Sequence, residues 1–310
     1  MHVMRVNEPG REPVLLAAEV AQPCPGDGEV LIRVRAAGIT PSELMWYPTT
    51  HTKQGTTRTG AVPGHEFSGT VAELGSNVSG VAVGDEVYGL NDWFADGATA
   101  EFCLTRPEWI AAKPASLTHE AAATVPISAL TASQGLFEHA KLQAGDRVLV
   151  HGGAGAVGLF AVQLAHRSGT HAIATASGRG VDFVKRLGAD EAIDYRASRF
   201  EDQIDAVDAV FDTVGGETLE RSWRVLKPGG RMVTVASESG AATEQRVKDA
   251  FFIVEPNRKQ LEEAALMIDR GELRVFVKAT VPFSDVSAAY SGKSADRSGF
   301  GKLAVAVSGQ

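Results

Sequence analysis

The sequence has few cysteines, no long apolar run and no excess of basic charge. Cys24 and Cys103, the two cysteines among 310 residues, match no metal-binding spacing and form no disulfide framework. We therefore expect a reducing, cytoplasmic location. No apolar run is long enough to span a bilayer, which predicts that the protein has no membrane partner. A net charge of -8 lacks the positive field of a nucleic-acid binder, so no nucleic-acid partner is expected.

The chain has an ordinary apolar content of 44% and many glycines, 33 in all. In its first third, short β-branched runs alternate with glycine, proline and asparagine turn signals, which favours a mostly antiparallel barrel or sandwich. Alanine-rich helical periodicity follows at 120–140, and then strands alternate with helices. That alternation predicts βαβ units and a parallel sheet covered on both faces.

The last part of the chain reads as one helix over 256–273 followed by strands at 275–283 and 302–307. We interpret these strands as returning to the first domain and completing its sheet. The predicted organisation is therefore an α/β protein in which residues 1–124 and 256–310 form one domain. Residues 125–255 form the other.

A glycine-rich loop points to a nucleotide. Gly153, Gly155 and Gly158 match G-x-G-x-x-G between the strand-like run 147–150 and an amphipathic helix. Glycine allows a sharp turn and a close approach to a pyrophosphate, and the helix N-terminus offers free N–H groups. Ala154, Ala156 and Val157 are the other predicted contacts in the loop. The alternative is a glycine-rich turn that binds nothing.

The end of the second strand bears on which nucleotide is bound. An NAD site would place Asp or Glu there, to accept a hydrogen bond from the ribose 2′-hydroxyl. Here the strand ends at Ala176 and Ser177, and Arg179 follows. A hydroxyl and a guanidinium suit a 2′-phosphate, so the sequence predicts NADP(H). The alternative is that Arg179 merely begins a surface helix.

Several ordered motifs give the sequence a family resemblance. They include "RAAGITPSEL", "VPGHEFSGTVAELGSNVSGVAVGDEVYG", "AAATVPISALTASQGL", "HGGAGAVGLFAVQLA", "LKPGGRMVTVAS" and "FFIVEPNRKQLEEAA". Over nearly its whole length the chain resembles a medium-chain dehydrogenase/reductase of the zinc-independent quinone oxidoreductase type. The resemblance implies a GroES-like β-barrel catalytic domain built from both ends of the chain. It also implies a Rossmann doubly wound parallel-sheet domain, NADP(H) in the cleft between the domains, and a homodimer.

The resemblance also implies cofactor contacts, each of which could instead be strand-end packing. The matching positions are Thr131, Tyr195, Val214, Ala236, Ser237, Phe251, Phe252, Ile253, Gly301 and Lys302. Tyr195 would lie near the 2′-phosphate with Ser177 and Arg179. Phe251, Phe252 and Ile253 would line the nicotinamide pocket, which Gly301 and Lys302 would close.

The positions that resemble the catalytic zinc ligands of relatives have lost most of their donors. They carry Thr40, His65 and Ala129, whereas a catalytic zinc needs three protein ligands and an open position. We therefore predict no metal, with His65 as a hydrogen-bonded turn residue. Without a Lewis acid, an acceptor that delocalises negative charge is favoured. The expected substrate is a small-molecule quinone or α,β-unsaturated carbonyl compound.

Thr40 and Tyr47 are the predicted catalytic donors to the acceptor oxygen, with Ser42 and Trp46 as other candidates. The polar segment 45–62 is expected to form a mobile rim of the substrate site. One alternative is a trans-acting enoyl reductase, with Lys53 and Arg58 holding the phosphate of a thioester carrier. Another is a non-catalytic, crystallin-like protein that binds NADPH.

Overall fold

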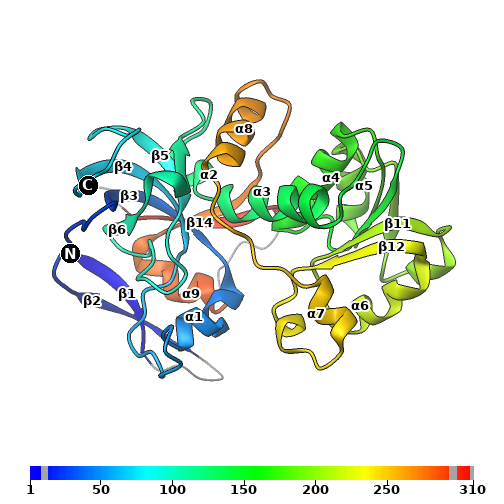
Figure 1. The fold of residues 1–310 in the computed structure, drawn as a ribbon, viewed down its shortest axis with the longest axis horizontal. Helices are drawn as coiled ribbons and strands as arrows, with labels where there is room; N and C mark the ends of the chain where they lie inside the picture. The colour runs from blue at the N-terminus through cyan, green and yellow to red at the C-terminus, as the bar shows by residue number, and fades with distance from the viewer. Residues whose placement is uncertain (8–12, 293–298, 308–310) are drawn as a thin grey trace. The chain divides into compact units, whose positions relative to one another are not determined.

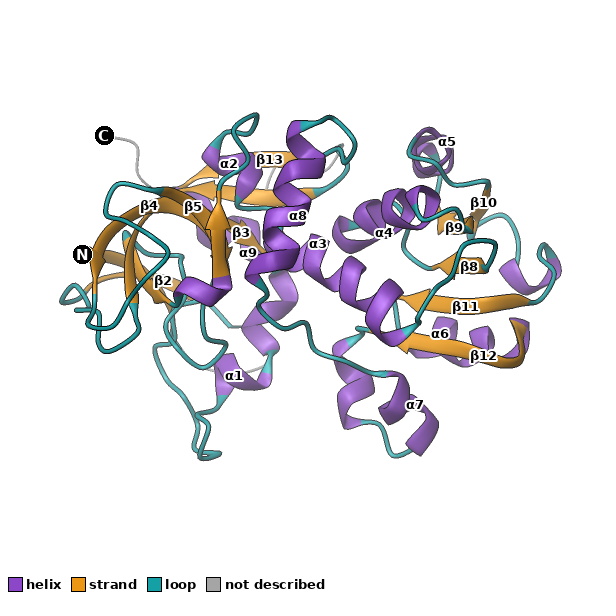
Figure 2. Ribbon diagram, turned by 45° about the horizontal axis from the view of Figure 1, so that its top comes forward, coloured by secondary structure: helices purple, strands orange, loops and turns teal. Residues whose placement is uncertain are grey.

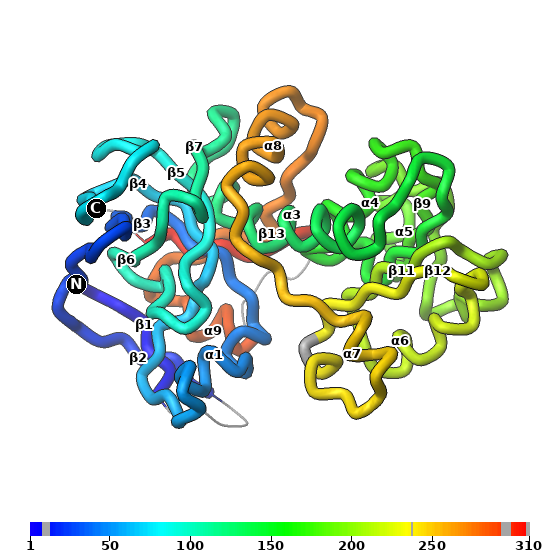
Figure 3. Tube along the Cα trace, in the orientation of Figure 1, coloured from blue at the N-terminus to red at the C-terminus, as the bar shows by residue number. Residues whose placement is uncertain are grey.

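A computed structural model describes residues 1–7, 13–292 and 299–307, with the side chain of Ser237 excluded. The chain forms two compact units (Figure 1). The first unit contains Met1–Ile127 and Pro256–Gln310, and the second contains Ser128–Glu255. Figure 3 traces the chain through the first unit, into the second, and back again.

A seven-stranded sheet forms the centre of the first unit, in the order β13-β14-β3-β4-β5-β7, with β6 paired to β3. Its strands are β3 (Val30–Ile39), β4 (Glu66–Leu74), β5 (Glu86–Leu90), β6 (Phe102–Thr105), β7 (Ile110–Ala112), β13 (Val277–Pro282) and β14 (Lys302–Ala306). The pairs are antiparallel except for β13 and β14. Leu303 of β14 lies opposite Ile39 of β3, so the end of the chain completes the sheet, as the sequence predicted.

Two further strands, which the sequence analysis did not predict, pair at the start of the chain. β1 (His2–Val6) and β2 (Leu15–Glu19) form a separate antiparallel pair. Short elements in this unit are the 3-10 helices η1 (Pro41–Met45), η2 (Pro107–Trp109) and η7 (Phe283–Asp285), with the helices α1 (Tyr47–Thr50) and α9 (Val286–Tyr290). The longer helix α8 (Arg258–Asp269) begins at Asn257, whose side chain caps it by accepting the N–H of Gln260.

The predicted crossover helix is broken into three pieces. α2 (His119–Ala122) is followed by α3 (Pro126–Ser133) and then by one π-helical turn, η3 (Gln134–His139). Proline is favoured at the first turn of a helix, and it disfavours helical backbone at the residue before it. Pro126 therefore starts a new helix. Gln134 then bonds both the N–H and the carbonyl of Glu255, which ties the two ends of the second unit together.

The second unit has a five-stranded parallel sheet in the order β10-β9-β8-β11-β12. The strands are β8 (Arg147–Val150), β9 (His171–Ala176), β10 (Glu191–Asp194), β11 (Val207–Asp212) and β12 (Leu226–Thr234). The helices are α4 (Ala156–Arg167), α5 (Arg179–Arg186), α6 (Gly216–Ser222) and α7 (Gln245–Ala250), with short 3-10 turns η4 (Phe200–Asp202), η5 (Trp223–Val225) and η6 (Ser237–Ala241). Figure 2 shows α4 and α5 on one side of this sheet and α6 and α7 on the other.

The chain order reverses at β8, the central strand of this sheet. Ligands of such sheets bind at the carboxyl ends of the strands next to this reversal. Leu149, Ile173 and Val210 fill the core around these strands. Within the described residues, no helix combines the length and the apolar character needed to cross a bilayer.

Candidate functional site

The glycine loop lies between β8 and α4, as predicted. A Cβ atom at Gly158 would overlap the carbonyl oxygen of Gly152, so only glycine fits there without movement. A Cβ at Gly153 would lie 2.8 Å from the Cβ of Ala174 on β9. These two glycines therefore allow the loop, the helix and the neighbouring strand to approach one another closely.

The loop leaves its outer surface open. Gly155 is exposed, while Ala154, Ala156 and Val157 are half-buried. Gly155 is also the N-cap of α4 and provides no side-chain hydrogen bond, so the first N–H groups of the helix have no side-chain cap. Open amide donors at the positive end of a helix suit a pyrophosphate, and these residues therefore fit a dinucleotide.

The ends of β9 and β10 bring the predicted 2′-phosphate residues together. Ala176 pairs with Asp194, so the segments that follow these strands are neighbours. Ser177 donates a hydrogen bond to the hydroxyl of Tyr195, and this bond is the main reason that the pKa of Tyr195 lies below its usual value. Arg179 is exposed at the first position of α5.

Two residues of this cluster were missed in the sequence analysis. The guanidinium of Arg196 lies 5.9 Å from the ring centroid of Tyr195 and also helps to lower the pKa of that phenol. Asp194 brings a carboxylate to the same edge, where it accepts the N–H of Gly178 at 3.3 Å and that of Arg196 at 3.0 Å. Their positions in the sequence, directly before and after Tyr195, could have indicated both residues. Because β10 pairs with β9, residues at the end of β10 lie beside those that follow β9.

The ends of β11 and β12 hold further predicted cofactor residues. Val214 is 51% exposed, whereas Ala236 is buried. Asp212, the last residue of β11, connects the two strand ends. Its carboxylate accepts the N–H of Val214 at 3.1 Å and the hydroxyl of Thr234 at 2.8 Å. Burial raises the pKa of Asp212, and these donors oppose that rise. Ser237 belongs to η6, and its side chain lies outside the described residues.

The predicted nicotinamide-pocket residues of this unit differ in exposure. Phe252 is buried and stacks on His139 at a centroid distance of 4.2 Å. Phe251 is half-buried, Ile253 is 64% exposed, and Thr131 is buried in α3. Phe252 is therefore withdrawn from solvent, whereas Ile253 presents an apolar side chain outward.

Thr40 and Tyr47 lie in the first unit, where Thr40 directly precedes η1 and Tyr47 begins α1. The hydroxyl of Thr40 is buried and has no hydrogen-bond partner among the residues that the structure describes. Tyr47 is 55% exposed, stacks on His51 at 4.5 Å and meets Phe94 edge-on. A buried hydroxyl without a partner is costly, so Thr40 is the better candidate for a hydrogen bond to a bound molecule.

The polar segment 45–62 is fastened to the segment 92–96 rather than free. Lys53 pairs with Asp92 at 2.8 Å, and Arg58 pairs with Asp96 at 2.8 Å. The guanidinium of Arg58 also donates to the carbonyl of Pro48 at 3.0 Å. The mobile rim stays a prediction, and these contacts show where the segment is attached. Lys53 and Arg58 do not form an unpaired basic patch.

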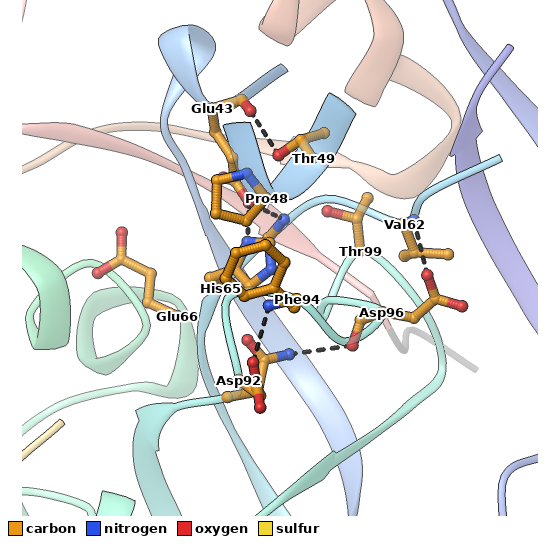
Figure 4. A network of polar contacts seen from close by, with 12 residues as sticks. Glu43, Pro48, Thr49, Val62, His65, Glu66, Asp92, Phe94, Asp96 and Thr99 are labelled. Carbon is orange, nitrogen blue, oxygen red and sulfur yellow. Dashed lines mark hydrogen bonds and ion pairs between the residues drawn. The ribbon is translucent and has the colours of Figure 1, made fainter. Parts of the chain in front are cut away.

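His65 directly precedes β4 and Glu66 begins it, and each has a buried partner. Figure 4 shows the two side chains. Nδ1 of His65 bonds the carboxylate of Glu43, which also accepts the N–H of Gly64 at 2.6 Å. Nε2 of His65 is buried, and no residue in the described part of the chain forms a hydrogen bond with it. The carboxylate of Glu66 points away from this pair, as the alternation of a strand requires.

Lys302, at the start of β14, forms an ion pair with Glu66, and both side chains are buried. Burial raises the pKa of Glu66, while Lys302 lowers it. The N–H of Ile127 also donates to Glu66, at 3.0 Å. Gly301 has a φ of 93°, and a Cβ there would overlap the carbonyl of Phe276. These two residues therefore fix how β14 joins the sheet.

Comparison with known proteins places these features in a family. Residues 26–112 match the alcohol dehydrogenase GroES-like domain, and residues 187–305 match the zinc-binding dehydrogenase family. A probable zinc-binding mitochondrial oxidoreductase of Arthroderma benhamiae is 34% identical over 276 residues, which cover 83% of this chain and 82% of that protein. The chain belongs to the medium-chain dehydrogenase/reductase superfamily.

This medium-chain dehydrogenase/reductase is also similar to two other oxidoreductases. The chloroplastic NADPH-dependent alkenal/one oxidoreductase of Arabidopsis thaliana is 32% identical, over 91% of this chain and 73% of that protein. The solved quinone oxidoreductase of Coxiella burnetii is 29% identical, with a TM-score of 0.86 over 99% of both chains. The predicted membership of the quinone oxidoreductase-like family, which is a family of oxidoreductases, is confirmed. The predicted GroES-like and Rossmann folds are also confirmed.

The donor set of this medium-chain reductase does not fit a catalytic zinc. Thr40 has no thiolate, His65 gives Nδ1 to Glu43, and Ala129 has no donor atom. Within the part of the chain that the structure describes, no three His, Cys, Asp or Glu side chains are grouped to hold a metal ion. A catalytic zinc requires three protein ligands, so the residues present disagree with one.

Proposed function

We propose that the protein is an NADPH-dependent reductase of quinones or α,β-unsaturated carbonyl compounds that works without a metal ion. The observation that carries the proposal is the pairing of the open glycine loop with Ser177, Arg179 and Tyr195 at the next strand end. Family membership and the NADPH-dependent alkenal/one oxidoreductase among the relatives support it.

In this proposal the loop residues Gly153–Gly158 hold the pyrophosphate with backbone N–H groups. Ser177, Arg179 and Tyr195 hold the 2′-phosphate, and we add Arg196 because its guanidinium lies beside Tyr195. Asp194 accepts two backbone N–H groups and keeps its negative charge. In this proposal the guanidinium groups of Arg179 and Arg196 offset that charge as well as the charge of the 2′-phosphate. The remaining proposed cofactor contacts are Thr131, Val214, Ala236, Ser237, Phe251, Phe252, Ile253, Gly301 and Lys302.

The bound nicotinamide would supply the hydride, and the protein would orient the acceptor and stabilise its developing negative charge. We assign the hydrogen bond to the acceptor oxygen to Thr40, whose buried hydroxyl lacks a partner within residues 1–7, 13–292 and 299–307, with Tyr47 as a second donor. An acceptor that delocalises charge suits this site, because the zinc-ligand positions lack the donors of a Lewis acid.

The enoyl reductase alternative gains no support from the first unit. It requires cationic groups for the phosphate of a thioester carrier, yet Lys53 and Arg58 are paired with Asp92 and Asp96.

We also propose a homodimer in the cytosol. Size-exclusion chromatography with light scattering tests the dimer.

The test of the cofactor assignment is a titration with NADPH and with NADH, for the wild type and for Arg179→Ala. We expect the variant to bind NADPH about 10- to 100-fold more weakly, because a charged hydrogen bond contributes roughly 1.5–3 kcal/mol. NADH binding should be unchanged. Equal loss for both cofactors would contradict the 2′-phosphate assignment. Absence of NADPH oxidation across quinones and enones would contradict the proposed reaction.

A further inference from the structure

A buried imidazole lies directly before the glycine loop. His151 follows β8 and is 1% exposed. Its Nδ1 lies 3.1 Å from the hydroxyl of Thr175 on β9, and its Nε2 lies 2.8 Å from the hydroxyl of Ser222 at the end of α6. The ring also meets Phe200 of η4 edge-on, at a centroid distance of 4.6 Å. One side chain therefore joins three elements around the start of the loop.

The partners of this imidazole determine where its proton lies. The hydroxyl of Ser222 donates to the carbonyl of Thr218 at 2.6 Å, so its oxygen must accept from Nε2–H of His151. Burial, aided by the positive charge of Arg221, lowers the pKa of His151 to about 3, and the ring stays neutral near pH 7. In the neutral ring Nδ1 has no proton. It therefore accepts the hydroxyl proton of Thr175.

Thr175 in turn holds the glycine loop at two points. Its hydroxyl oxygen accepts the N–H of Gly152 at 3.3 Å, and its backbone carbonyl accepts the N–H of Gly153 at 2.9 Å. Because Nδ1 of His151 takes the hydroxyl proton, the lone pairs of the Thr175 oxygen are left to face Gly152. An unbroken chain of hydrogen bonds thus runs from Gly152 through Thr175, His151 and Ser222 to Thr218.

We propose that His151 is a positioning residue: a neutral, Nε2-protonated imidazole that sets the conformation of the dinucleotide loop by fixing the hydroxyl of Thr175. The inference rests on the proposed cofactor function, because its consequence is measured in cofactor binding. His151 itself has no role in the chemical step. Loss of its Nδ1 acceptor weakens cofactor binding and leaves turnover at saturating cofactor unchanged.

The first test compares Thr175→Val with a matched control, Thr170→Val. Thr170 is also buried in the second unit, and its hydroxyl donates to the carbonyl of Ala165 at 2.7 Å, away from the loop. We expect Thr175→Val to raise the Kd and KM for NADPH roughly tenfold, with kcat unchanged. Thr170→Val should lower the melting temperature by about as much as Thr175→Val does and leave the Kd and KM for NADPH unchanged. Equal NADPH affinity in the two variants would overturn the proposal.

A second pair of variants tests the ring nitrogen. His151→Leu removes the acceptor and should reproduce the rise in Kd and KM. His151→Asn keeps an acceptor oxygen near the position of Nδ1 and should recover most of the affinity. If His151→Leu binds NADPH as tightly as the wild type, the positioning role is wrong.

The ¹⁵N spectrum of the His151 ring tests the hydrogen-bond chain without any cofactor. We expect a protonated Nε2 and an unprotonated Nδ1 that do not titrate between about pH 5.5 and 8. A ring that titrates in this range, or the opposite tautomer, would refute the chain of hydrogen bonds. If the wild type binds neither NADPH nor NADH, the proposed function fails. Even then, the ¹⁵N spectrum decides whether the chain of hydrogen bonds through His151 exists, because it needs no cofactor.

Discussion

Gly158 lies where the first turn of α4 passes closest to the loop that precedes it. A methyl group there would overlap the carbonyl oxygen of Gly152 and lie 2.7 Å from the Cα of Gly153. Gly155, which is within three residues of each of these glycines, is exposed, and its Cβ would lie 3.1 Å from the same carbonyl oxygen of Gly152. The two glycines thus have different roles, one in packing and one in leaving room for an anion.

Alanine at each position should separate these roles. We expect Gly158→Ala to lower the free energy of unfolding by about 1–3 kcal/mol, because close-packed backbone must move. Gly155→Ala should cost less than Gly158→Ala, because its Cβ would meet a single atom, the carbonyl oxygen of Gly152, at 3.1 Å. It should still weaken NADPH binding, because Gly155 lies on the exposed side of the loop. Chemical denaturation and cofactor titration measure the two effects. Equal stability of the two variants would contradict the packing argument.

At the scale of single residues, the sequence analysis named Ser177, Arg179 and Tyr195 as a cluster, and the structure adds Asp194 and Arg196 beside them. The first two follow one strand directly, and the family resemblance supplied Tyr195. Asp194 and Arg196 gain meaning only from the pairing of β10 with β9, which is a long-range contact. Lys53 and Arg58 were misread for a related reason. Their acidic partners lie about forty residues further along the chain.

Two elements of the first unit are joined by a single phenol. The hydroxyl of Tyr88, on β5, donates to the carbonyl of Leu261, on α8, at 2.5 Å, and the tyrosine is fully buried. We expect Tyr88→Phe to lower the free energy of unfolding by about 1 kcal/mol. Tyr47→Phe is the matched control, because Tyr47 is 55% exposed, and it should have no measurable effect on stability. Thermal unfolding of the two variants checks the difference.

In the second unit, η4 is bound to α6 by a carboxylate. Glu201 takes two hydrogen bonds from Arg221, at 2.8 and 2.5 Å, and its side chain is 9% exposed. Arg221, with help from Arg199, lowers the pKa of Glu201 to about 2. In the unfolded chain the carboxyl of Glu201 has a pKa of about 4.3. The ion pair therefore stabilises the fold fully above that pH and loses its contribution as the pH falls toward 2.

Glu201→Gln should therefore lower the free energy of unfolding by about 1–2 kcal/mol at pH 7. The difference from the wild type should shrink as the pH falls below about 4.3. Asp202→Asn is the control, since the neighbouring Asp202 is 67% exposed and lies 4.0 Å from its arginine partner. Urea titrations at several pH values measure both. A difference that does not depend on pH would contradict the pairing.

Element by element, the sequence predicted the alternating strands and helices of the second unit well, because glycine turns and apolar runs mark each boundary. It missed β1 and β2, which are short. Of the five residues in Leu15–Glu19, only Leu15 is buried, so no alternating pattern marks the strand. The crossover was predicted as one helical stretch, because its alanine content hid the restart at Pro126.

Across the whole molecule, the described residues offer no group of three metal-binding side chains. We therefore expect dialysis against a chelator to change the rate of NADPH oxidation by less than about twofold. Added zinc should not raise it, because one histidine cannot hold a catalytic zinc. A rate that falls with the chelator and returns with zinc would contradict metal independence.

The position of β14 has a consequence for synthesis on the ribosome. β14 pairs with β3, some 270 residues earlier, whereas the second unit is one continuous stretch, Ser128–Glu255. Chains emerge from the N-terminus at roughly 5–20 residues per second, and domains generally fold as units. The second unit is therefore released complete while the first still lacks its β13 and β14 strands. The second unit is therefore ready to fold first, and the first unit completes its sheet only after β13 and β14 have emerged.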